Sequence, residues 1–317
     1  MKRYAIIALI ALVASAGTVF AQKTITKSYT GVKRVKVNTS SGDCELKKST
    51  GTSIDVVLTH DYDDDEYTPK FEQDGDRLII GEKFNGNRVS GSAKWTISVP
   101  DGVSVTFSTG SGNLIARGIN ITLDVNTGSG DLEFSSMKGE LDANTGSGNV
   151  EVASFNGNAK INTGSGDMDV RDSDGELDLN CGSGDIKVAS AKGLFDINTG
   201  SGNINAEKLT VSASSKFNTG SGRSKIALAA TPTADISVNS GSGTAEVNFA
   251  GNAIVGEVVM KASKRNGRIT APFEFDKTEE ENYGKYNDVT IVKTAQKGKG
   301  SNRIYISTGS GDAVLKQ

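Results

Sequence analysis

Acidic and amide side chains recur at a fixed interval through the middle of the chain, and such oxygen donors could hold a metal ion. Each follows a Gly-Ser-Gly tripeptide: Asn113, Asp131, Asn149, Asp167, Asp185 and Asn203. Calcium takes about six to eight oxygen ligands and prefers carboxylates, so Asp131, Asp167 and Asp185 are the calcium candidates. At most one such carboxylate per repeat is sparse for this purpose, and Asx side chains at turns also bond backbone N–H groups. We expect a structural role and no bound metal, with a calcium-stabilised β-roll as the alternative.

Pairs of acidic residues offer a second kind of chemistry, the cleavage of glycosidic bonds. Asp124 with Asp142 and Glu133 with Glu151 form such pairs on the polar side of the repeats. Regular repetition, however, distributes acids throughout, and aromatic residues that could line a sugar cleft make up only 6% of the chain. His60 is the single histidine, which removes most histidine-dependent catalysis. We expect no catalytic residue, and a polysaccharide-acting enzyme is the least favoured alternative.

The composition excludes further classes of protein. The 317 residues carry a net charge of −3, whereas a nucleic-acid-binding protein concentrates basic residues on one face. We therefore expect no nucleic-acid partner, and no cofactor. The two cysteines, Cys44 and Cys181, lie several repeats apart, and a disulfide needs Cα atoms within about 7 Å. Two buried free thiols are expected.

The N-terminus has the pattern of a cleavable export signal. Lys2 and Arg3 precede a short apolar run, and small residues follow it up to Ala21. This order is typical of a secretory signal peptide, with cleavage predicted after Ala21. The next residue is Gln22 and not cysteine, which argues against a lipoprotein. The sequence predicts a secreted or periplasmic protein without a membrane span.

A regular internal repeat must position all of these side chains. Gly-Ser-Gly begins at Gly110, Gly128, Gly146, Gly164, Gly182 and Gly200, each 18 positions after the last, and returns after other intervals at Gly220, Gly241 and Gly309. On both sides of the tripeptide apolar and polar residues alternate, as in strands with one buried face. Each repeat thus holds two short strands, which cannot bury their faces alone.

Stacking successive repeats in register solves this burial problem. We predict an all-β fold, a single elongated right-handed β-solenoid with 18-residue coils, two short strands per coil and irregular capping segments. The hand is assigned by analogy, and an antiparallel meander would have the same period. Stacking would align one asparagine per coil into a hydrogen-bonded ladder: Asn126, Asn144, Asn162, Asn180, Asn198, Asn218 and Asn239.

Glycine at the turns would permit a positive φ where a side chain would clash. The turn glycines of the regular repeats are Gly128, Gly130, Gly146, Gly148, Gly164, Gly166, Gly182, Gly184, Gly200 and Gly202. Both ends of the repeat region lose the 18-residue interval. The predicted organisation is a signal peptide (1–21) and one solenoid domain (22–317), made of N-terminal coils and cap (22–109), regular repeats (110–243), and C-terminal coils and cap (244–317).

These motifs resemble a known family. The Asn-Thr-Gly-Ser-Gly-Asp coils, the Val-Pro-Asp-Gly turn at 99–102 and the closing Ser-Thr-Gly-Ser-Gly-Asp at 307–312 are similar to bacterial β-strand-repeat "putative adhesin" domains of unknown function. The resemblance implies the repeat fold and offers no catalytic residues. We expect a non-catalytic, adhesin-like module of the cell envelope that presents a repetitive surface to a cell-surface glycan or protein, with a passive envelope scaffold as an alternative.

Overall fold

The computed structural model describes residues 22–86, 89–283 and 288–317. The predicted signal peptide lies outside these residues. They contain 27 strands and no helix, which confirms the all-β prediction, and none of their segments is a helix long and apolar enough to cross a membrane. The chain forms two compact units, unit 1 up to Asn149 and unit 2 from Val150.

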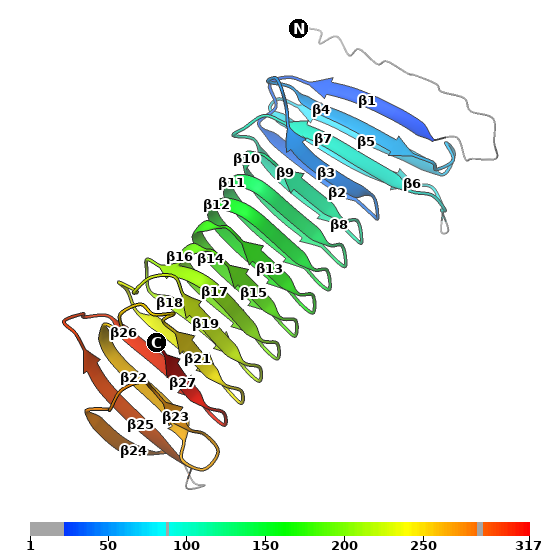
Figure 1. Cartoon of the computed structure of the whole chain (residues 1–317). Coiled ribbons are helices and arrows are strands. Elements are labelled where there is room, and N and C mark those ends of the chain that lie inside the picture. The colour runs from blue at the N-terminus through cyan, green and yellow to red at the C-terminus, as the bar shows by residue number, and fades with distance from the viewer. Residues whose placement is uncertain (1–21, 87–88, 284–287) are drawn as a thin grey trace. The chain divides into compact units, whose positions relative to one another are not determined.

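Parallel pairing at a fixed offset organises the core of unit 1. Strand β10 (Asn120–Thr127) lies between β8 (Ser104–Thr109) and β11 (Leu132–Thr145), and β11 also pairs with β9 (Leu114–Arg117). Each residue of β10 faces the residue 18 positions later, so Val125 is the partner of Ala143. Identical positions of successive repeats therefore lie beside one another, as the ladder in Figure 1 shows.

Unit 2 is also built by parallel pairing, in two ladders whose offset is 18 residues at first and lengthens to 20 and then 21. One ladder is made of the strands that precede the Gly-Ser-Gly turns in the sequence, and the other of the strands that follow them. Strand β12 is long enough to belong to both. The first comprises β12 (Val150–Thr163), β14 (Asp174–Cys181), β16 (Lys192–Thr199), β18 (Ser215–Thr219) and β20 (Ile236–Ser240). The second comprises β12, β13 (Met168–Arg171), β15 (Ile186–Ala189), β17 (Ile204–Val211), β19 (Ser224–Leu228) and β21 (Ala245–Asn248).

The alternation predicted from the sequence is the burial pattern of these strands. Residues such as Leu179, Ile197 and Phe217 are buried, while the residues directly before and after each of them on its own strand are exposed or half-buried. A further inward column, which the sequence analysis missed, fills the corner opposite the Gly-Ser-Gly turn: Met137, Phe155, Ser173, Ala191 and Leu209. These residues recur every 18 positions, but their mixed sizes and polarity hide the column in the sequence.

That corner also corrects the prediction of two short strands in every repeat. Strands β11 and β12 each run for 14 residues through the corner without a break. A residue in the left-handed region bends them, and the same position has a positive φ in five repeats: Ser136, Ser154, Asp172, Ser190 and Lys208. Ladder pairing continues on both sides of this residue, so the chain turns with little loss of backbone hydrogen bonding.

Antiparallel strands cover the N-terminal end of unit 1. Strand β2 (Arg34–Thr39) pairs in parallel with β8 and with β6 (Arg77–Phe84), and β3 (Asp43–Lys48) pairs in parallel with β9 and with β7 (Ala93–Val99). Beyond them β4 (Ile54–His60) pairs antiparallel with β7 and with β1 (Lys23–Tyr29), and β5 (Tyr67–Asp74) pairs antiparallel with β6. This end therefore carries a separate cap.

Unit 2 ends in a comparable way. Strands β26 (Arg303–Thr308) and β27 (Ala313–Lys316) pair in parallel with β20 and β21, although Ile236 and its partner Ile304 are far apart in the sequence. The intervening chain forms β22 (Gly256–Ser263), β23 (Ile269–Thr270), β24 (Lys277–Tyr283) and β25 (Asp288–Lys297). Strands β22 and β23 continue the parallel ladders, and the antiparallel β25 and β24 lie beyond β22.

Candidate functional site

A buried side chain, in most repeats a hydroxyl, braces the Gly-Ser-Gly turns. The Thr145 Oγ1 accepts a hydrogen bond from the Gly148 N–H at 3.0 Å and donates one to the Gly130 carbonyl at 3.3 Å. Thr199, Thr219, Ser240 and Thr308 repeat both bonds, each with its own pair of glycines. In one repeat the Cys181 thiol replaces the hydroxyl, between Gly184 and Gly166. The threonine column is thus an internal brace of the turns.

The turn glycines are required for a reason other than the one predicted. Within the described residues, none of the ten named turn glycines has a φ in the left-handed region. A Cβ on Gly128 would lie 2.5 Å from the Gly110 carbonyl oxygen, and one on Gly130 would meet the Gly112 carbonyl even more closely. Close stacking of backbone on backbone excludes a side chain there. Positive φ occurs instead at Gly139, Gly157, Gly175 and Gly193, in the opposite corner.

The asparagines before the turns stack in register within each unit. Asn126 is the partner of Asn144 in unit 1, and in unit 2 the series Asn162, Asn180, Asn198, Asn218 and Asn239 is in register. The amide of Asn218 donates to the Asn198 Oδ1 at 2.8 Å, and that of Asn239 donates to the Asn218 Oδ1 at 2.8 Å. In unit 1 the Asn126 amide donates to Asp124, two residues earlier on its own strand.

The aspartates that follow the turns also bond along the stack. The Asp131 Oδ1 accepts the Asn149 N–H at 2.8 Å, the Asp167 Oδ1 accepts the Asp185 N–H at 2.8 Å, and the Asp185 Oδ1 accepts the Asn203 N–H at 2.7 Å. Over the described part of the chain, no three His, Cys, Asp or Glu residues are grouped closely enough to hold a metal. The calcium candidates act here as acceptors for the backbone of the next repeat.

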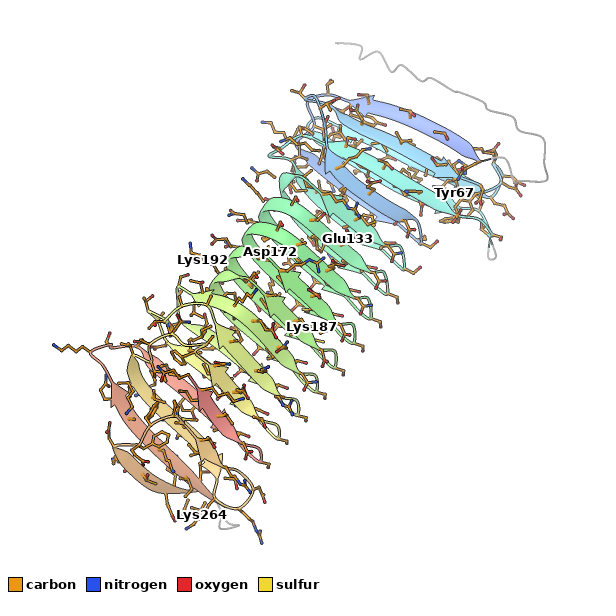
Figure 2. All side chains as sticks on the ribbon, viewed as in Figure 1. Tyr67, Glu133, Asp172, Lys187, Lys192 and Lys264 are labelled. Atoms are coloured by element: carbon orange, nitrogen blue, oxygen red, sulfur yellow. The ribbon has the colours of Figure 1, made fainter. Side chains whose placement is uncertain are left out.

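The carboxylates considered for glycan cleavage are engaged with neighbouring side chains. The Asp124 and Asp142 carboxylates accept the amides of Asn126 and Asn144. The Glu133 Oε1 lies 2.8 Å from an Arg117 nitrogen, and Glu151 pairs with Arg171. These contacts engage all four acids with side chains of their own or a neighbouring repeat, and Figure 2 labels Glu133 among the side chains of the ladder.

The two cysteines are both buried. Cys44, 2% exposed, faces Trp95 and Leu114 across the ladder. Burial raises the pKa of its thiol well above the usual range. Cys181 is part of the turn column described above. Both thiols are free.

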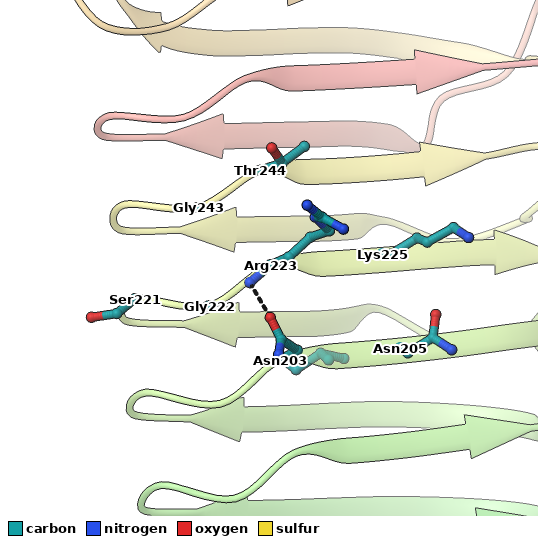
Figure 3. Close-up of a pocket in the computed structure, with 9 residues that line it drawn as sticks. Asn203, Asn205, Ser221, Gly222, Arg223, Lys225, Gly243 and Thr244 are labelled. Atoms are coloured by element: carbon teal, nitrogen blue, oxygen red, sulfur yellow. Dashed lines mark hydrogen bonds between the residues drawn. The ribbon is translucent and has the colours of Figure 1, made fainter.

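A groove opens on the surface of unit 2 where the repeat interval lengthens, at the tripeptides that begin with Gly220 and Gly241 (Figure 3). Its volume is about 700 Å³. The lining comes from three successive repeats: Asn203, Ile204, Asn205, Ser221, Gly222, Arg223, Lys225, Gly243 and Thr244. We call this the basic groove, because its two charged side chains are Arg223 and Lys225.

Neither cation of the basic groove is neutralised by a neighbour. Arg223 is exposed and Lys225 half-buried, and neither forms an ion pair with any described residue. The acid directly opposite Lys225 in the ladder is Glu246, whose Oε1 lies 2.9 Å from the Lys316 Nζ. Lys316 thus takes up the charge of Glu246, and the groove retains two positive charges.

A second, smaller cavity of about 260 Å³ lies elsewhere in unit 2. Lys216, Asp235, Arg303 and Tyr305 contribute to its lining. Arg303 is paired with Glu257 at 2.7 Å, and Asp235 contributes a carboxylate to the lining beside Lys216. Because acids accompany its cations, this cavity lacks the unbalanced charge of the basic groove.

A known protein family matches the repeat region of the chain. Residues 72–254, more than half of the chain, match the family model described as Toastrack DUF4097. No curated protein matches the chain.

Several solved structures are similar over 93% of this chain. A putative cell adhesion protein from Clostridium sporogenes matches over 99% of its own length, with 14% identity and a TM-score of 0.28. A putative lipid binding protein from Parabacteroides distasonis (96% of its length, 14% identity) has a TM-score of 0.39. A putative adhesin from Bacteroides fragilis (96% of its length, 13% identity) has a TM-score of 0.33.

Proposed function

The chain belongs to the Toastrack DUF4097 family, and from that premise we propose that it is an exported, non-catalytic, adhesin-like module that binds a cell-surface glycan. It acts in the periplasm or outside the cell after removal of residues 1–21. Its fold is a right-handed β-solenoid with 18-residue coils, and both ends are capped by antiparallel strands.

The basic groove is the observation that carries this proposal. Side chains from three successive repeats line it, and they offer charge, amide and hydroxyl groups together with exposed turn backbone. Sugars are recognised by hydrogen bonds from such polar groups. The groove lies on stacked strands, which fix the backbone positions from which its side chains project, so little backbone ordering is needed on binding.

The stacked surface suits multivalent binding. Outward positions recur at the strand spacing of about 4.8 Å, and a linear polymer could contact several repeats at once. Linked contacts raise the overall affinity without any new interaction chemistry. A glycan chain fits this geometry better than a small free ligand.

A glycan array probed with the exported chain tests the proposal, together with an assay for the release of reducing sugar. We expect binding to a subset of glycans and no release. Absence of binding to every glycan would overturn the proposal and favour a passive scaffold, and release of sugar would show an enzyme.

The calcium-stabilised alternative has a separate test. We expect the melting temperature to be the same in millimolar calcium and in chelator, because the Asp131, Asp167 and Asp185 carboxylates already accept backbone N–H groups. A large stabilisation by calcium would favour the β-roll.

A further inference from the structure

We propose that the basic groove recognises an acidic polysaccharide, in which sugar carboxylates are bound by Arg223 and Lys225. This inference rests on the proposed function, since it names the class of glycan that the same groove takes. It assigns the charged contact to two residues and the neutral contacts to the amides and hydroxyls around them.

Arg223 interrupts a column that is otherwise acidic or neutral, and Lys225 lies two residues further on in the next outward column. Arg223 occupies the position after the Gly-Ser-Gly turn, where the five preceding repeats have Asp131, Asn149, Asp167, Asp185 and Asn203. Its backbone keeps the structural role of the column, because the Arg223 N–H donates to the Asn203 Oδ1 at 2.9 Å. Its side chain does not repeat that role. The arginine is therefore unnecessary for stacking.

Lys225 lies in an outward column of mixed charge, which also holds Lys187 two repeats earlier. It faces Asn205 in the preceding repeat and Glu246 in the following one. Glu207 accepts the Asn205 amide at 3.3 Å and Glu246 is paired with Lys316, and neither of these acids forms an ion pair with Lys225. Two uncompensated cations on a chain of net charge −3 indicate a binding role for this position.

The spacing of the two cations suits a carboxylate on a sugar ring. Arg223 and Lys225 are two residues apart on one extended segment, so their side chains leave the same face about 7 Å apart at the backbone. Figure 3 shows both on the same face as Asn205, with Thr244 in the next repeat. Arginine binds a carboxylate through two parallel N–H···O bonds, and lysine adds a mobile point charge.

The rest of the lining favours a polysaccharide over other anions. Ser221 and Thr244 contribute hydroxyl groups and Asn205 an amide, which match the hydroxyls of a sugar. Ile204 is the single large apolar residue of the lining, so the groove has little surface for a lipid tail or an apolar peptide side chain. Nucleic acids are bound through many phosphate contacts, and two cations are few for that purpose.

The test uses a double variant that borrows residues from the preceding repeat. Arg223→Asn with Lys225→Asn gives each position the side chain of its neighbour, Asn203 or Asn205, so the strands keep their pairing. The control, Lys160→Asn with Lys192→Asn, removes two exposed positive charges of unit 2 outside the groove. Melting temperatures of all three proteins verify that they fold.

Binding is measured to polygalacturonate, dextran sulfate and neutral dextran at fixed salt. We expect the unaltered chain to bind polygalacturonate, the groove variant to bind it at least tenfold more weakly, and the control to stay within twofold. Neutral dextran should not bind to any of the three. Equal losses of polygalacturonate affinity in the groove variant and the control, or no loss in either, would overturn the assignment of the binding site to the basic groove.

Two other outcomes separate this inference from the proposed function. If the chain binds dextran sulfate but not polygalacturonate, carboxylate recognition is wrong while glycan binding stands. If it binds only neutral glycans of the array, and the groove variant binds them equally well, the inference fails and the proposed function survives. If no glycan binds, both fail.

Discussion

Single side chains inside the turns decide how well successive repeats hold together. Cys181 is the natural variant of the threonine column, with Thr163 and Thr199 as its partners across the ladder. We predict that Cys181→Thr raises the free energy of unfolding by about 0.5 kcal/mol, since a hydroxyl makes stronger hydrogen bonds than a thiol. Cys181→Val should lower it by about 1–3 kcal/mol, because the Gly184 N–H loses its acceptor.

Urea denaturation of these two variants and of Cys181→Ser measures the difference. Serine supplies the hydroxyl without the methyl group, as Ser240 does in the same column. A stability of Cys181→Val equal to that of Cys181→Thr would show that the side chain fills space and does not brace the turn.

His60 makes the cap of unit 1 sensitive to pH. It is 3% exposed, its Nδ1 has no hydrogen-bond partner among the residues that the structure describes, and its ring centroid lies 4.8 Å from that of Tyr67. Burial lowers the pKa of His60 below its usual 6.5, with a smaller lowering from Lys23, against Asp64 and Asp61, which raise it. The unfolded chain therefore takes up the proton at a higher pH than the folded chain.

It follows that the His60 contribution to stability is complete above about pH 6.5 and is lost as the pH falls below that value towards the folded pKa. We predict that the melting temperature falls more between pH 7.5 and 5 for the unaltered chain than for His60→Phe, where no titrating group remains at this position. An identical pH dependence in both proteins would contradict this role of His60.

At the level of one structural element, the corner opposite the Gly-Ser-Gly turn depends on a left-handed residue. Ser136, Ser154, Asp172 and Ser190 take this conformation with short polar side chains. Lys208 takes it, at φ 54°, with a long side chain. A long side chain is strained there, whereas asparagine tolerates the conformation. We predict that Lys208→Asn raises the free energy of unfolding by about 0.5–1 kcal/mol.

The matched control for this corner is Lys187→Asn. Lys187 is also an exposed lysine of unit 2 but lies in strand β15 without a positive φ, so no gain is expected. Equal changes in the two variants, measured by urea denaturation, would mean that loss of a surface charge and not relief of backbone strain explains the result.

For each unit as a whole, the caps protect the ends of the ladders. Among the described strands, β24 has β25 as its one partner, and Lys277 and Glu279 on it are exposed and form an ion pair at 2.7 Å. Charges on an edge strand oppose pairing with another chain. We predict that Lys277→Val with Glu279→Val causes self-association that grows with protein concentration.

Light scattering over a range of concentrations measures this association. The control, Lys160→Val with Glu176→Val, places the same substitutions on β12 and β14, which pair with each other and with further ladder strands. This control should associate no more than the unaltered chain does. Equal association of both variants would show that added apolar surface, and not an open edge, is responsible.

The sequence by itself determined the repeated part of the fold. The 18-residue interval and the alternation of apolar and polar residues state which positions stack and which face inward, because each repeat meets the same environment as its neighbour. The column of Asn198, Asn218 and Asn239 and the buried face of the strands could therefore be predicted. The single elongated domain and its hand remain predictions.

Only the tertiary structure shows the contacts between segments that are far apart in the sequence. The pairing of β20 with β26 joins Ile236 to Ile304 across five intervening strands, β21 to β25, and no local pattern encodes such a closure. The reason for the turn glycines is the approach of one backbone to another, and the basic groove exists because Asn205 and Lys225 from two repeats meet on one face. Stacking brings these groups together, so their chemistry becomes visible only when the chain is folded.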